Sequence, residues 1–454
     1  MTPSLPENIN DKETQLSAQS FEEMTLDELA KVLSLTIKYD DTNKLVVFLA
    51  MLSAFTDSSQ INVSLNSQSS TGKSFIATEI AKLFPVEDKV ERSGASPTAF
   101  FYEQGVFDEE LKARIVSLER KILIFYEQPN SQLQEKLRAL LSHDQRDLKY
   151  SFTNKDKGKN KADRVILRGF PSTIFCSAGL RLDEQETTRA VLLSPEVTDA
   201  KILAGMLSQA HRSANADEYK AWIESRPERI TLKERIIAIR DEHVDEIIVP
   251  NHEDIDKRFR EMFPIPKPRH MRDISHLVQL IKAISLLNVW HRRHEDGTIL
   301  ANESDVSQAF ELWKGFSESQ EFNVPPVVLQ FYKEIIVPAY IQKFNGLNYS
   351  DQRTMICEEV GLTPQELNSY HIIATERPMN GEQVRKQILP QLESSGLIAQ
   401  EKPKDDADKR TRHIFPKWFP DGNDPKTPNN IGKGGQDNTE GEGRVTQDIL
   451  DLFR

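Results

Sequence analysis

The chain has 454 residues, of which 38% are hydrophobic, so it has room for roughly two to four domains with ordinary buried cores. Its formal net charge of −12 argues against wholesale coating of nucleic acid, so any nucleic-acid contact has to come from local basic patches. Cys176 and Cys357 lie far apart in the sequence, which excludes a disulfide framework and a zinc site built from cysteines. Because neither a signal-peptide pattern nor an apolar run of about 20 residues is found, we expect a cytoplasmic protein without membrane contact.

Helical and strand patterns alternate in the amino-terminal part of the chain. Residues 1–22 are polar, aperiodic and contain two prolines, which predicts a disordered leader. Over residues 23–196, two helical runs precede a series in which strand-like runs alternate with helical ones; the strand-like runs read "INVSLN", "KILIFYE", "RVILRGF" and "STIFCSA". Strands separated by helices predict an α/β fold with a mostly parallel sheet that is covered on both faces.

The rest of the chain divides into four segments. Residues 197–325 have a helical pattern and are predicted to form an all-helical lid. Residues 326–418 contain three short helical runs and then two extended pieces joined by a charged turn, which suggests a winged helix-turn-helix. Gly, Pro, Asn and Asp dominate residues 419–444, a predicted flexible linker, and residues 445–454 form a short apolar peptide.

A phosphate-binding motif stands between the first strand and the next helix. The stretch "SLNSQSSTGKS" ends in the G-K-S of the P-loop pattern G-x-x-x-x-G-K-[ST]. Glycines in that pattern turn successive N–H groups toward phosphate oxygens, while the lysine serves the phosphates and the Ser or Thr serves Mg²⁺. Ser67 replaces the first glycine, at a cost of about 1 kcal/mol if its φ is positive. The residues expected to bind the nucleotide are Ser67, Ser70, Thr71, Gly72, Lys73 and Ser74.

A carboxylate is expected at the end of another buried strand, because Mg²⁺ needs an acidic ligand across from the P-loop serine. Glu127 meets this expectation, since it follows the apolar and aromatic run from Ile122 to Tyr126. The alternative is a strand that merely ends in a surface charge, which would be favoured if the P-loop were absent. Together the two motifs predict a site for ATP and Mg²⁺, with Ser74 and Glu127 as the residues that hold the metal.

In the order of these motifs the chain resembles the AAA+ ATPases, and among them the minichromosome maintenance (MCM) helicases and related helicase-like ATPases of plasmids and other mobile elements. The resemblance covers residues 45–415 approximately. "SSTGKSF" resembles the Walker A motif, "ILIFYEQ" the Walker B motif, "STIFCSAG" the sensor-1 strand and "LDEQETTRAVLLSPE" the arginine-finger segment. The resemblance implies an AAA+ P-loop ATPase core with a helical lid, followed by a C-terminal winged helix domain.

The resemblance also implies roles for individual residues. Ser177 is the implied polar sensor, and Arg189 is the implied finger, which would act on the γ-phosphate held by the next subunit. "PRHMRDISHLVQLIKAI" resembles the sensor-2 helix, with Arg272 favoured over Arg269. A finger that acts on a neighbour implies a heterologous ring, and the resemblance favours a hexamer. The alternative for Arg189 is a surface or lid-pairing arginine.

Two features depart from the pattern of the family. Gln128 follows Glu127 where many AAA+ proteins carry the carboxylate that activates the attacking water, and a glutamine cannot take up that proton. Hydrolysis is then expected to be slow, unless Glu127 both binds Mg²⁺ and activates the attacking water. About 45 residues precede the ATPase core, so the N-terminal DNA-binding and zinc-binding modules of the family are not expected here. Loading onto DNA would then be organised differently, for example by a partner.

A basic segment occupies the place of the hairpin that precedes sensor 1 in the family. From Lys149 to Arg168 there are seven Lys and Arg against two Asp. The lysines alternate around Gly158, which predicts positive charge at the tip of a hairpin. In a ring ATPase such a hairpin would grip the phosphates of a threaded strand, whereas the alternative is a solvated lysine-rich turn. The expected DNA-binding residues are Lys155, Lys157, Lys159 and Lys161.

The two C-terminal features suggest partners of different kinds. The predicted wing carries basic residues interleaved with Asp405, Asp406 and Asp408, so DNA binding, protein binding and a structural role all stay open. The final "QDILDLFR" matches the Q-x-x-hydrophobic-x-x-aromatic pattern of sliding-clamp-binding peptides, and a flexible tether would present it. The alternative is an amphipathic C-terminal helix that packs on its own protein. The expected clamp-binding residues are Gln447, Leu450, Leu452 and Phe453.

These patterns together predict an ATP-dependent, ring-forming DNA helicase that resembles the MCM helicases and serves the replication of a mobile element or similar replicon. Its cofactors would be ATP and Mg²⁺, and single-stranded DNA would pass the basic hairpin in the ring channel. A helicase loader or assembly factor with little hydrolysis is the first alternative. The second is a DNA-binding regulator in which the winged helix acts and the ATPase core is structural.

Overall fold

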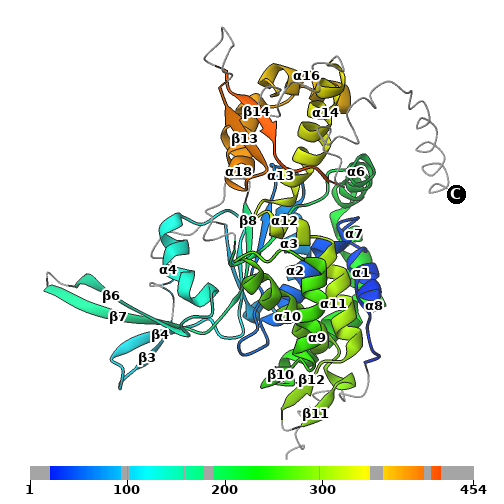
Figure 1. Cartoon of the computed structure of the whole chain (residues 1–454). Helices are drawn as coiled ribbons and strands as arrows, with labels where there is room; N and C mark the ends of the chain where they lie inside the picture. Colours follow the sequence, from blue (N-terminus) through cyan, green and yellow to red (C-terminus); the bar gives the residue numbers. More distant parts are fainter. Residues whose placement is uncertain are drawn as a thin grey trace, which may run out of the picture. The chain divides into compact units, whose positions relative to one another are not determined.

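The computed structural model describes residues 21–93, 100, 103, 105–156, 159–177, 188–295, 297–347, 361–402 and 411–420 (Figure 1). The chain forms two compact units, and the boundary between them in the sequence lies between Val327 and Val328. Almost all of the predicted leader and linker, and the whole C-terminal peptide, lie outside the described residues.

The first unit is built on a sheet of five strands, all of them parallel to their neighbours, in the order β2-β5-β8-β1-β9. The four strands after β2 are fully buried, as expected for apolar runs with helices on both faces. This sheet confirms the predicted α/β class. The strands are β1 (Val63–Asn66), β2 (Lys89–Arg92), β5 (Ile122–Phe125), β8 (Ser172–Ser177) and β9 (Val191–Leu193).

The two faces of this sheet pack against different helices, because successive side chains of a strand point to opposite sides. On one face Ile122, Ile124 and Cys176 join a large core with α2 (Asp41–Ser53) and α3 (Lys73–Ala81). On the other face Leu123, Phe125 and Phe175 form a smaller core with α4 (Ser131–Leu141). A residue on β5 or β8 can therefore be assigned to the α3 face or the α4 face.

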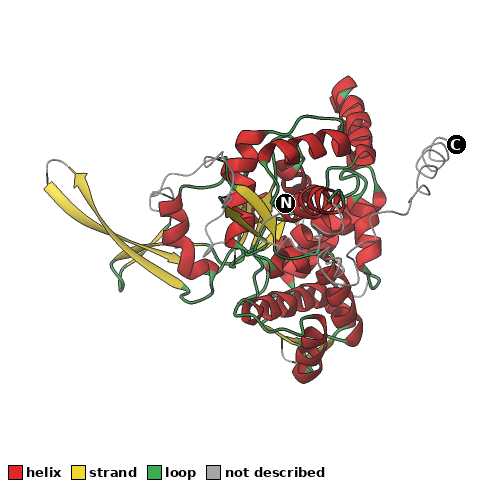
Figure 2. Cartoon of the chain, turned by 45° about the horizontal axis from the view of Figure 1, so that its top comes forward, coloured by secondary structure: helices red, strands yellow, loops and turns green. Residues whose placement is uncertain are grey.

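A second, mixed sheet has the strand order β3-β4-β7-β6 and holds the predicted basic hairpin. The run "RVILRGF", expected in the central sheet, belongs to β7 of this second sheet instead, because it pairs with β4 and β6. The two long strands of the hairpin extend away from the central sheet (Figures 1 and 2). The strands are β3 (Val106–Asp108), β4 (Ala113–Ser117), β6 (Asp147–Asp156) and β7 (Lys159–Arg168).

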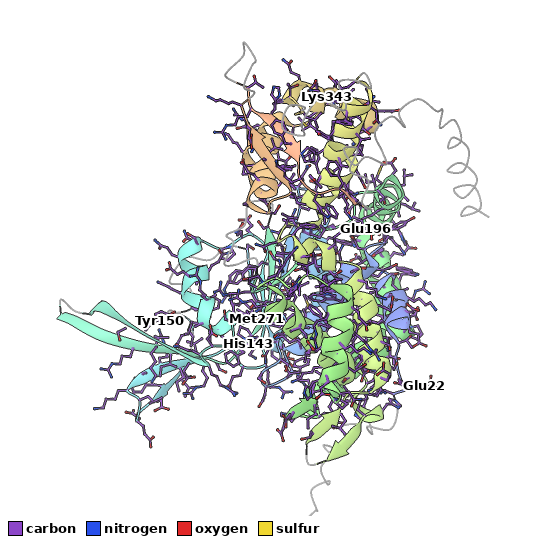
Figure 3. The ribbon with its side chains drawn as sticks, viewed as in Figure 1. Glu22, His143, Tyr150, Glu196, Met271 and Lys343 are labelled. Carbon is purple, nitrogen blue, oxygen red and sulfur yellow. The ribbon has the colours of Figure 1, made fainter. Side chains whose placement is uncertain are left out.

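The base of the hairpin is anchored to the α4 face of the first unit. The Tyr150 hydroxyl on β6 donates a hydrogen bond of 2.6 Å to the carbonyl oxygen of Lys136 on α4 (Figure 3). Leu148 and Leu167 contribute to the smaller core together with α4. The hairpin therefore starts from a rigid support.

Residues 197–325 are mainly helical and share one continuous core with the α3 face of the sheet. Helix α10 packs against both α2 and α11. The segment also contains three short strands, in the order β10-β12-β11, which the sequence analysis missed. The elements are α6 (Asp199–Ala214), α7 (Ala216–Glu224), α8 (Pro227–Asp241), β10 (Glu246–Ile248), α9 (His252–Met262), α10 (His270–Leu287), β11 (Arg293–Glu295), β12 (Thr298–Leu300), α11 (Glu303–Lys314) and α12 (Ser317–Glu321).

Helix α1 (Leu26–Leu33) begins at a capping box, which is the usual pattern for a Thr N-cap followed three residues later by Glu. The Thr25 hydroxyl accepts a hydrogen bond from the backbone N–H of Glu28, and the Glu28 carboxylate accepts one from the backbone N–H of Thr25. Both contacts satisfy backbone donors that the first helical turn leaves without partners. Leu26, Leu29 and Leu33 then bury one face of the helix in the large core.

The second unit has short helices followed by a two-stranded antiparallel sheet. This is the order expected for a winged helix, although residues 403–410 between the two strands lie outside the described residues. No helix in the described parts of either unit is both long enough and apolar enough to cross a membrane. The elements are α13 (Pro326–Phe331), a π-helical turn (Tyr332–Ile336), α14 (Val337–Asn345), α16 (Pro364–Thr375), α17 (Gly381–Gln383), a second π-helical turn (Val384–Ile388), α18 (Leu389–Ser394), β13 (Ile398–Glu401) and β14 (His413–Pro416).

Candidate nucleotide-binding site

The predicted phosphate loop connects the carboxyl end of β1 to the amino end of α3. Gly72 is the N-cap of α3 and has a φ of 100°, which suits glycine and strains other residues. Ser70 also has a positive φ, of 66°. The loop therefore turns sharply just before a helix whose amino end favours a negative charge.

Ser67 occupies the position of the missing first glycine without backbone strain. It is absent from the residues with positive φ, so the cost foreseen for a serine there does not arise. Its backbone N–H donates a hydrogen bond of 3.4 Å to the carbonyl oxygen of Ser177 on β8. Its side-chain hydroxyl is buried and makes no hydrogen bond to any residue that the structure describes. A polar group of this kind is available to a ligand or a water molecule.

Lys73 lies inside the loop, with only 7% of its surface exposed. Its Nζ donates a hydrogen bond of 2.8 Å to the carbonyl oxygen of Ser67 and a second one to the carbonyl oxygen of Gln68. Burial lowers the pKa of this ammonium group. Because a buried cation gains most from a nearby anion, Lys73 fits the role of a phosphate contact.

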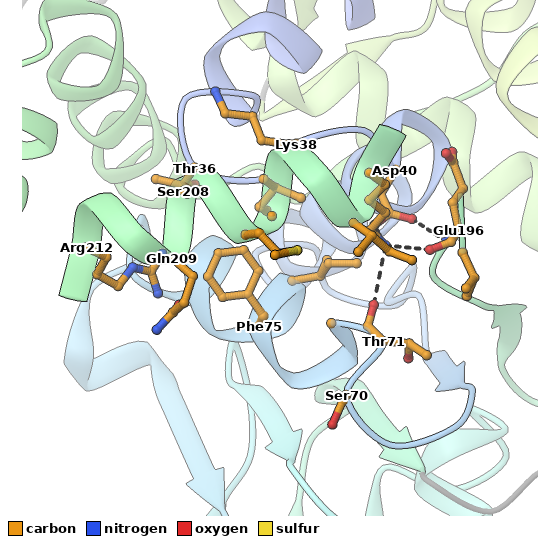
Figure 4. Close-up of a pocket in the computed structure, with 18 residues that line it drawn as sticks. Thr36, Lys38, Asp40, Ser70, Thr71, Phe75, Glu196, Ser208, Gln209 and Arg212 are labelled. Atoms are coloured by element: carbon orange, nitrogen blue, oxygen red, sulfur yellow. Dashed lines mark hydrogen bonds and ion pairs between the residues drawn. The ribbon is translucent and has the colours of Figure 1, made fainter. Parts of the chain in front are cut away.

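A cavity of about 590 Å³ adjoins the phosphate loop (Figure 4). Three segments line it: residues 36–40 between α1 and α2, residues 70–76 of the loop and α3, and residues 196–212 around α6. Its walls include Ile37 and Phe75. A cavity of this size with an apolar wall and a few polar groups is typical of a small-molecule site.

Lys201 on α6 connects the three segments that line the cavity through polar contacts. Its Nζ donates a hydrogen bond of 2.9 Å to the carbonyl oxygen of Glu196 and forms an ion pair with the buried carboxylate of Asp40. It also lies 3.4 Å from the carbonyl oxygen of Thr71 in the phosphate loop. The sequence analysis missed Asp40 and Lys201, because they belong to no motif and only the fold brings them beside the loop.

Arg212, at the other end of α6, fastens this helix to α3. Its guanidinium carbon lies 4.8 Å from the centre of the Phe75 ring, and the group forms an ion pair of 3.6 Å with Glu79. No residue of α6 is itself buried. The helix is therefore held over the cavity mainly by polar and cation–π contacts at its two ends.

The residues predicted to act beside the phosphate loop follow β5 and end β8. Glu127 and Gln128 come after β5 and are exposed, and Ser177 is the last residue of β8. The Ser177 hydroxyl donates a hydrogen bond of 2.8 Å to the side-chain oxygen of Gln128. Because β8 lies between β5 and β1, these residues share the carboxyl edge of the sheet with the phosphate loop.

Tyr126 comes directly before Glu127 and turns toward α3. It packs against the large core, and its hydroxyl donates a hydrogen bond of 2.8 Å to the carboxylate of Glu91 on β2. Burial is the main reason that the pKa of this phenol rises to about 12. The sequence analysis did not single out Tyr126 or Glu91.

The two arginines implied by the resemblance lie together, but not beside the phosphate loop. The Arg189 Nε donates a hydrogen bond of 2.6 Å to the Ser142 hydroxyl, and Arg272 donates one to the hydroxyl of Thr188. Both arginines line a polar cavity of about 160 Å³. Arg189 is also near Asn62, which precedes β1, whereas the phosphate loop follows β1. The Arg189 backbone therefore lies near the amino end of β1, while Arg189 also lines a small pocket together with Gln128 and Ser177.

The predicted basic hairpin exists as a hairpin, with Asp156 paired to Lys159 next to the turn. Lys155, Lys159 and Lys161 are on its two strands, while Lys157 lies outside the described residues. A second hairpin, β3–β4, pairs alongside it and was missed by the sequence analysis. Its Val106 and Phe107 are 77% and 58% exposed. The predicted clamp-binding residues Gln447, Leu450, Leu452 and Phe453 lie outside the described residues.

No protein-family model matches this chain, and no curated protein matches it. The class of the protein therefore follows from its fold and its site alone: it is an α/β protein with a parallel central sheet and a P-loop-like turn. Among the described residues, no group of three or more His, Cys, Asp or Glu is placed to hold a metal ion alone. The donor set fits Mg²⁺ that arrives with a nucleotide, because Mg²⁺ takes much of its coordination from phosphates and water.

Proposed function

We propose that the protein is an ATP-binding, ring-forming ATPase that acts on DNA as a helicase, in line with its resemblance to the MCM helicases. One observation carries the proposal. In the strand order β2-β5-β8-β1-β9, the strands that lead to Glu127, Ser177 and Lys73 are neighbours. Their carboxyl ends share one edge of the sheet, which is where open α/β sheets bind their ligands.

The nucleotide would lie along the phosphate loop and enter the cavity of about 590 Å³. The amino end of α3 and Lys73 would bind the phosphates, and the apolar wall with Phe75 would contact the base. Ser74 and Glu127 would serve Mg²⁺, which neutralises charge on the phosphates when it is bound. The orphaned hydroxyl of Ser67 and the buried ammonium of Lys73 support this assignment, since each gains a partner from a phosphate.

A ring explains why Arg189 and Arg272 lie apart from the phosphate loop of their own chain. In a heterologous ring, one edge of each subunit meets a different edge of the next, so both arginines would act on the nucleotide of a neighbour. Thr188 connects them, because it accepts a hydrogen bond from Arg272 and precedes Arg189 in sequence. A hexamer is the ring that the resemblance to the MCM helicases favours.

DNA would pass the basic hairpin in the channel of the ring. Lys155, Lys159 and Lys161 stand close to its turn, at the end farthest from the support that α4 provides. Positive side chains at such a position would contact phosphates without reading the base sequence. The winged-helix-like second unit would add a further contact to DNA or to a partner protein.

A paired measurement of ATPase activity and strand displacement tests this function. Lys73→Ala should abolish both activities, whereas Lys314→Ala, which removes an exposed lysine from α11, should leave both unchanged. Substituting Lys155, Lys159 and Lys161 together by Ala should abolish strand displacement while nucleotide binding is kept. Nucleotide binding that is indifferent to Lys73→Ala would contradict the proposal.

A helicase loader is the second candidate, and the contact between Ser177 and Gln128 favours it. An amide in the position of the water-activating carboxylate cannot accept a proton, so ATP would gate assembly more than it drives movement. The two candidates differ in one result. A loader would form an ATP-dependent ring on DNA without strand displacement, and a helicase would separate strands at a rate that follows hydrolysis.

A further inference from the structure

Successive side chains of β5 point to opposite faces of the sheet. At the carboxyl end of the strand, the side chain on the α3 face is not a carboxylate. Ile122 and Ile124 belong to the large core on the α3 side, while Leu123 and Phe125 belong to the core on the α4 side. Tyr126 continues the first series and packs against the large core. A phenol therefore occupies the position on the phosphate-loop side, and Glu127 is one residue beyond it.

Glu91 on the neighbouring strand β2 supplies a carboxylate on this face. The Lys89 Nζ donates a hydrogen bond of 2.7 Å to the carbonyl oxygen of Ala81 on α3, so the alternate residues Lys89 and Glu91 face that helix. The Tyr126 hydroxyl donates a hydrogen bond of 2.8 Å to the carboxylate of Glu91, and the side chain of Thr78 on α3 lies near the same hydroxyl. Glu91 itself is exposed and open to a ligand.

This carboxylate lies on the same side of the sheet as the serine expected to bind the cation, because its partner Tyr126 packs on the α3 side. Thr78 and Ser74 are four residues apart on α3, which is about one helical turn, or about 6 Å. Mg²⁺ keeps several of its water ligands at about 2.1 Å, and each of them can donate a hydrogen bond of about 2.7 Å to an acidic group. A carboxylate that faces α3 near Thr78, about one turn from Ser74, can therefore bind the water shell of an ion on the Ser74 hydroxyl.

We propose that Glu91, oriented by the Tyr126 hydroxyl, is the carboxylate that binds the hydrated Mg²⁺ of Mg²⁺–ATP, in place of an acid at the end of β5. This inference rests on the proposed function, because it needs a nucleotide at the phosphate loop. Glu127 would then activate the attacking water and would not bind Mg²⁺. Tyr126 is a positioning residue, since it acts through Glu91.

Binding of a fluorescent ATP analogue to the full chain, first in EDTA and then with rising MgCl₂, tests the inference without any need for turnover. Glu91→Gln should raise the Mg²⁺ concentration at half-maximal binding by about tenfold, as for other groups that orient a metal ion, and leave binding in EDTA unchanged. Tyr126→Phe, which keeps the ring, should shift it in the same direction by a smaller factor. Glu87→Gln removes an exposed carboxylate just before β2 and should cause no shift.

The outcomes separate this inference from the proposed function. If Glu91→Gln leaves the Mg²⁺ requirement unchanged while Glu127→Gln raises it about tenfold, the cation belongs to Glu127 and the inference is overturned. If binding depends on Lys73 but Mg²⁺ dependence is the same in every acidic variant, the inference also fails while the nucleotide site stands. If the wild type binds the analogue no better than Lys73→Ala does, both fail. Equal melting temperatures for Glu91→Gln and Glu87→Gln would exclude misfolding as the cause of a shift.

Discussion

The hydroxyl of Ser177 donates a hydrogen bond of 2.8 Å to the side-chain oxygen of Gln128, between the carboxyl ends of two neighbouring strands. The contact joins the end of β8 to the segment after β5. A neutral amide is thereby held at the position where many of the AAA+ ATPases that the sequence resembles carry a carboxylate. The consequences of this contact for hydrolysis can be measured directly.

Gln128→Glu is expected to raise the rate of ATP hydrolysis. A carboxylate at this position can accept the proton of the attacking water, and general-base catalysis typically contributes about 10²-fold or more. Gln132→Glu, which adds the same charge at an exposed position in the first turn of α4, is the control. Equal rates for Gln128→Glu and wild type would indicate that Glu127 already serves as the base.

Ser67→Gly and Gly72→Ala should have unequal effects, although both change the phosphate loop. Ser67 needs no positive φ, so glycine there should lower the free energy of unfolding by about 0.5–1 kcal/mol, and the loss of its hydroxyl should weaken ATP binding modestly. Gly72 has a φ of 100°, so alanine there should cost about 1–2 kcal/mol and weaken ATP binding. Chemical denaturation and nucleotide titration of the two variants measure these effects. A large gain in affinity from Ser67→Gly would show that the serine is a defect after all.

Arg292→Ala should strongly destabilise the first unit. The Arg292 guanidinium pairs with the Asp305 carboxylate through a 2.7 Å contact from Nε and a 2.5 Å contact from Nη2, and both side chains are almost fully buried. Removing one partner leaves an uncompensated buried charge, at a cost of about 3–5 kcal/mol in the free energy of unfolding. Arg258→Ala is the matched control, because Arg258 pairs with Glu303 at the start of the same helix, α11, but in solvent. We expect a cost below about 1 kcal/mol there.

The stability of the first unit should fall with acid partly through His276. Burial lowers the pKa of this imidazole from its ordinary value of 6.5 to about 4 in the folded state, while nearby Asp273 raises it and Arg269 lowers it by smaller amounts. The unfolded chain then binds more protons between pH 6.5 and 4. The contribution of His276 is therefore fully present above pH 6.5 and declines as the pH falls toward 4, by about 3 kcal/mol in all.

His276→Gln removes this titration and should flatten the slope of unfolding free energy against pH between 4 and 6.5. Urea unfolding at several pH values, compared with wild type, measures the difference. His143 and His270 also have lowered pKa values from burial, so the variant should flatten the slope without abolishing it. Identical slopes for variant and wild type would place the acid sensitivity elsewhere.

Deletion of residues 445–454 should abolish capture of the protein by a sliding clamp, if the terminal "QDILDLFR" is a clamp-binding peptide. Substituting Leu450 and Phe453 together by Ala should have the same effect as the deletion. Substituting Asp448 by Asn is the control, because this position is not one of the anchors of the pattern. Capture that is unchanged by the deletion would remove the clamp hypothesis and leave the ATPase proposal intact.

Local patterns were sufficient for much of the first unit. The strand before the phosphate loop and the helix after it follow from short-range periodicity, and Thr25 was recognisable as a cap from its own sequence context. The hairpin of β6 and β7 was also predicted, because its strands are adjacent in sequence. Short edge strands such as β2 and β10 were missed, since three or four partly exposed residues carry little periodicity.

The sequence by itself determined that a loop ending in Gly72, Lys73 and Ser74 lies between a strand and a helix, because residues so close in the chain constrain one another locally. Only the tertiary structure decided which strands are neighbours, and hence that Tyr126 meets Glu91 and Ser177 meets Gln128. It also decided that Asp40 and Lys201 join beside the loop, while Arg189 and Arg272 lie away from it. The reason is physical: hydrogen-bonded strand pairing and core packing join segments that are far apart in the chain, and no local pattern records that choice.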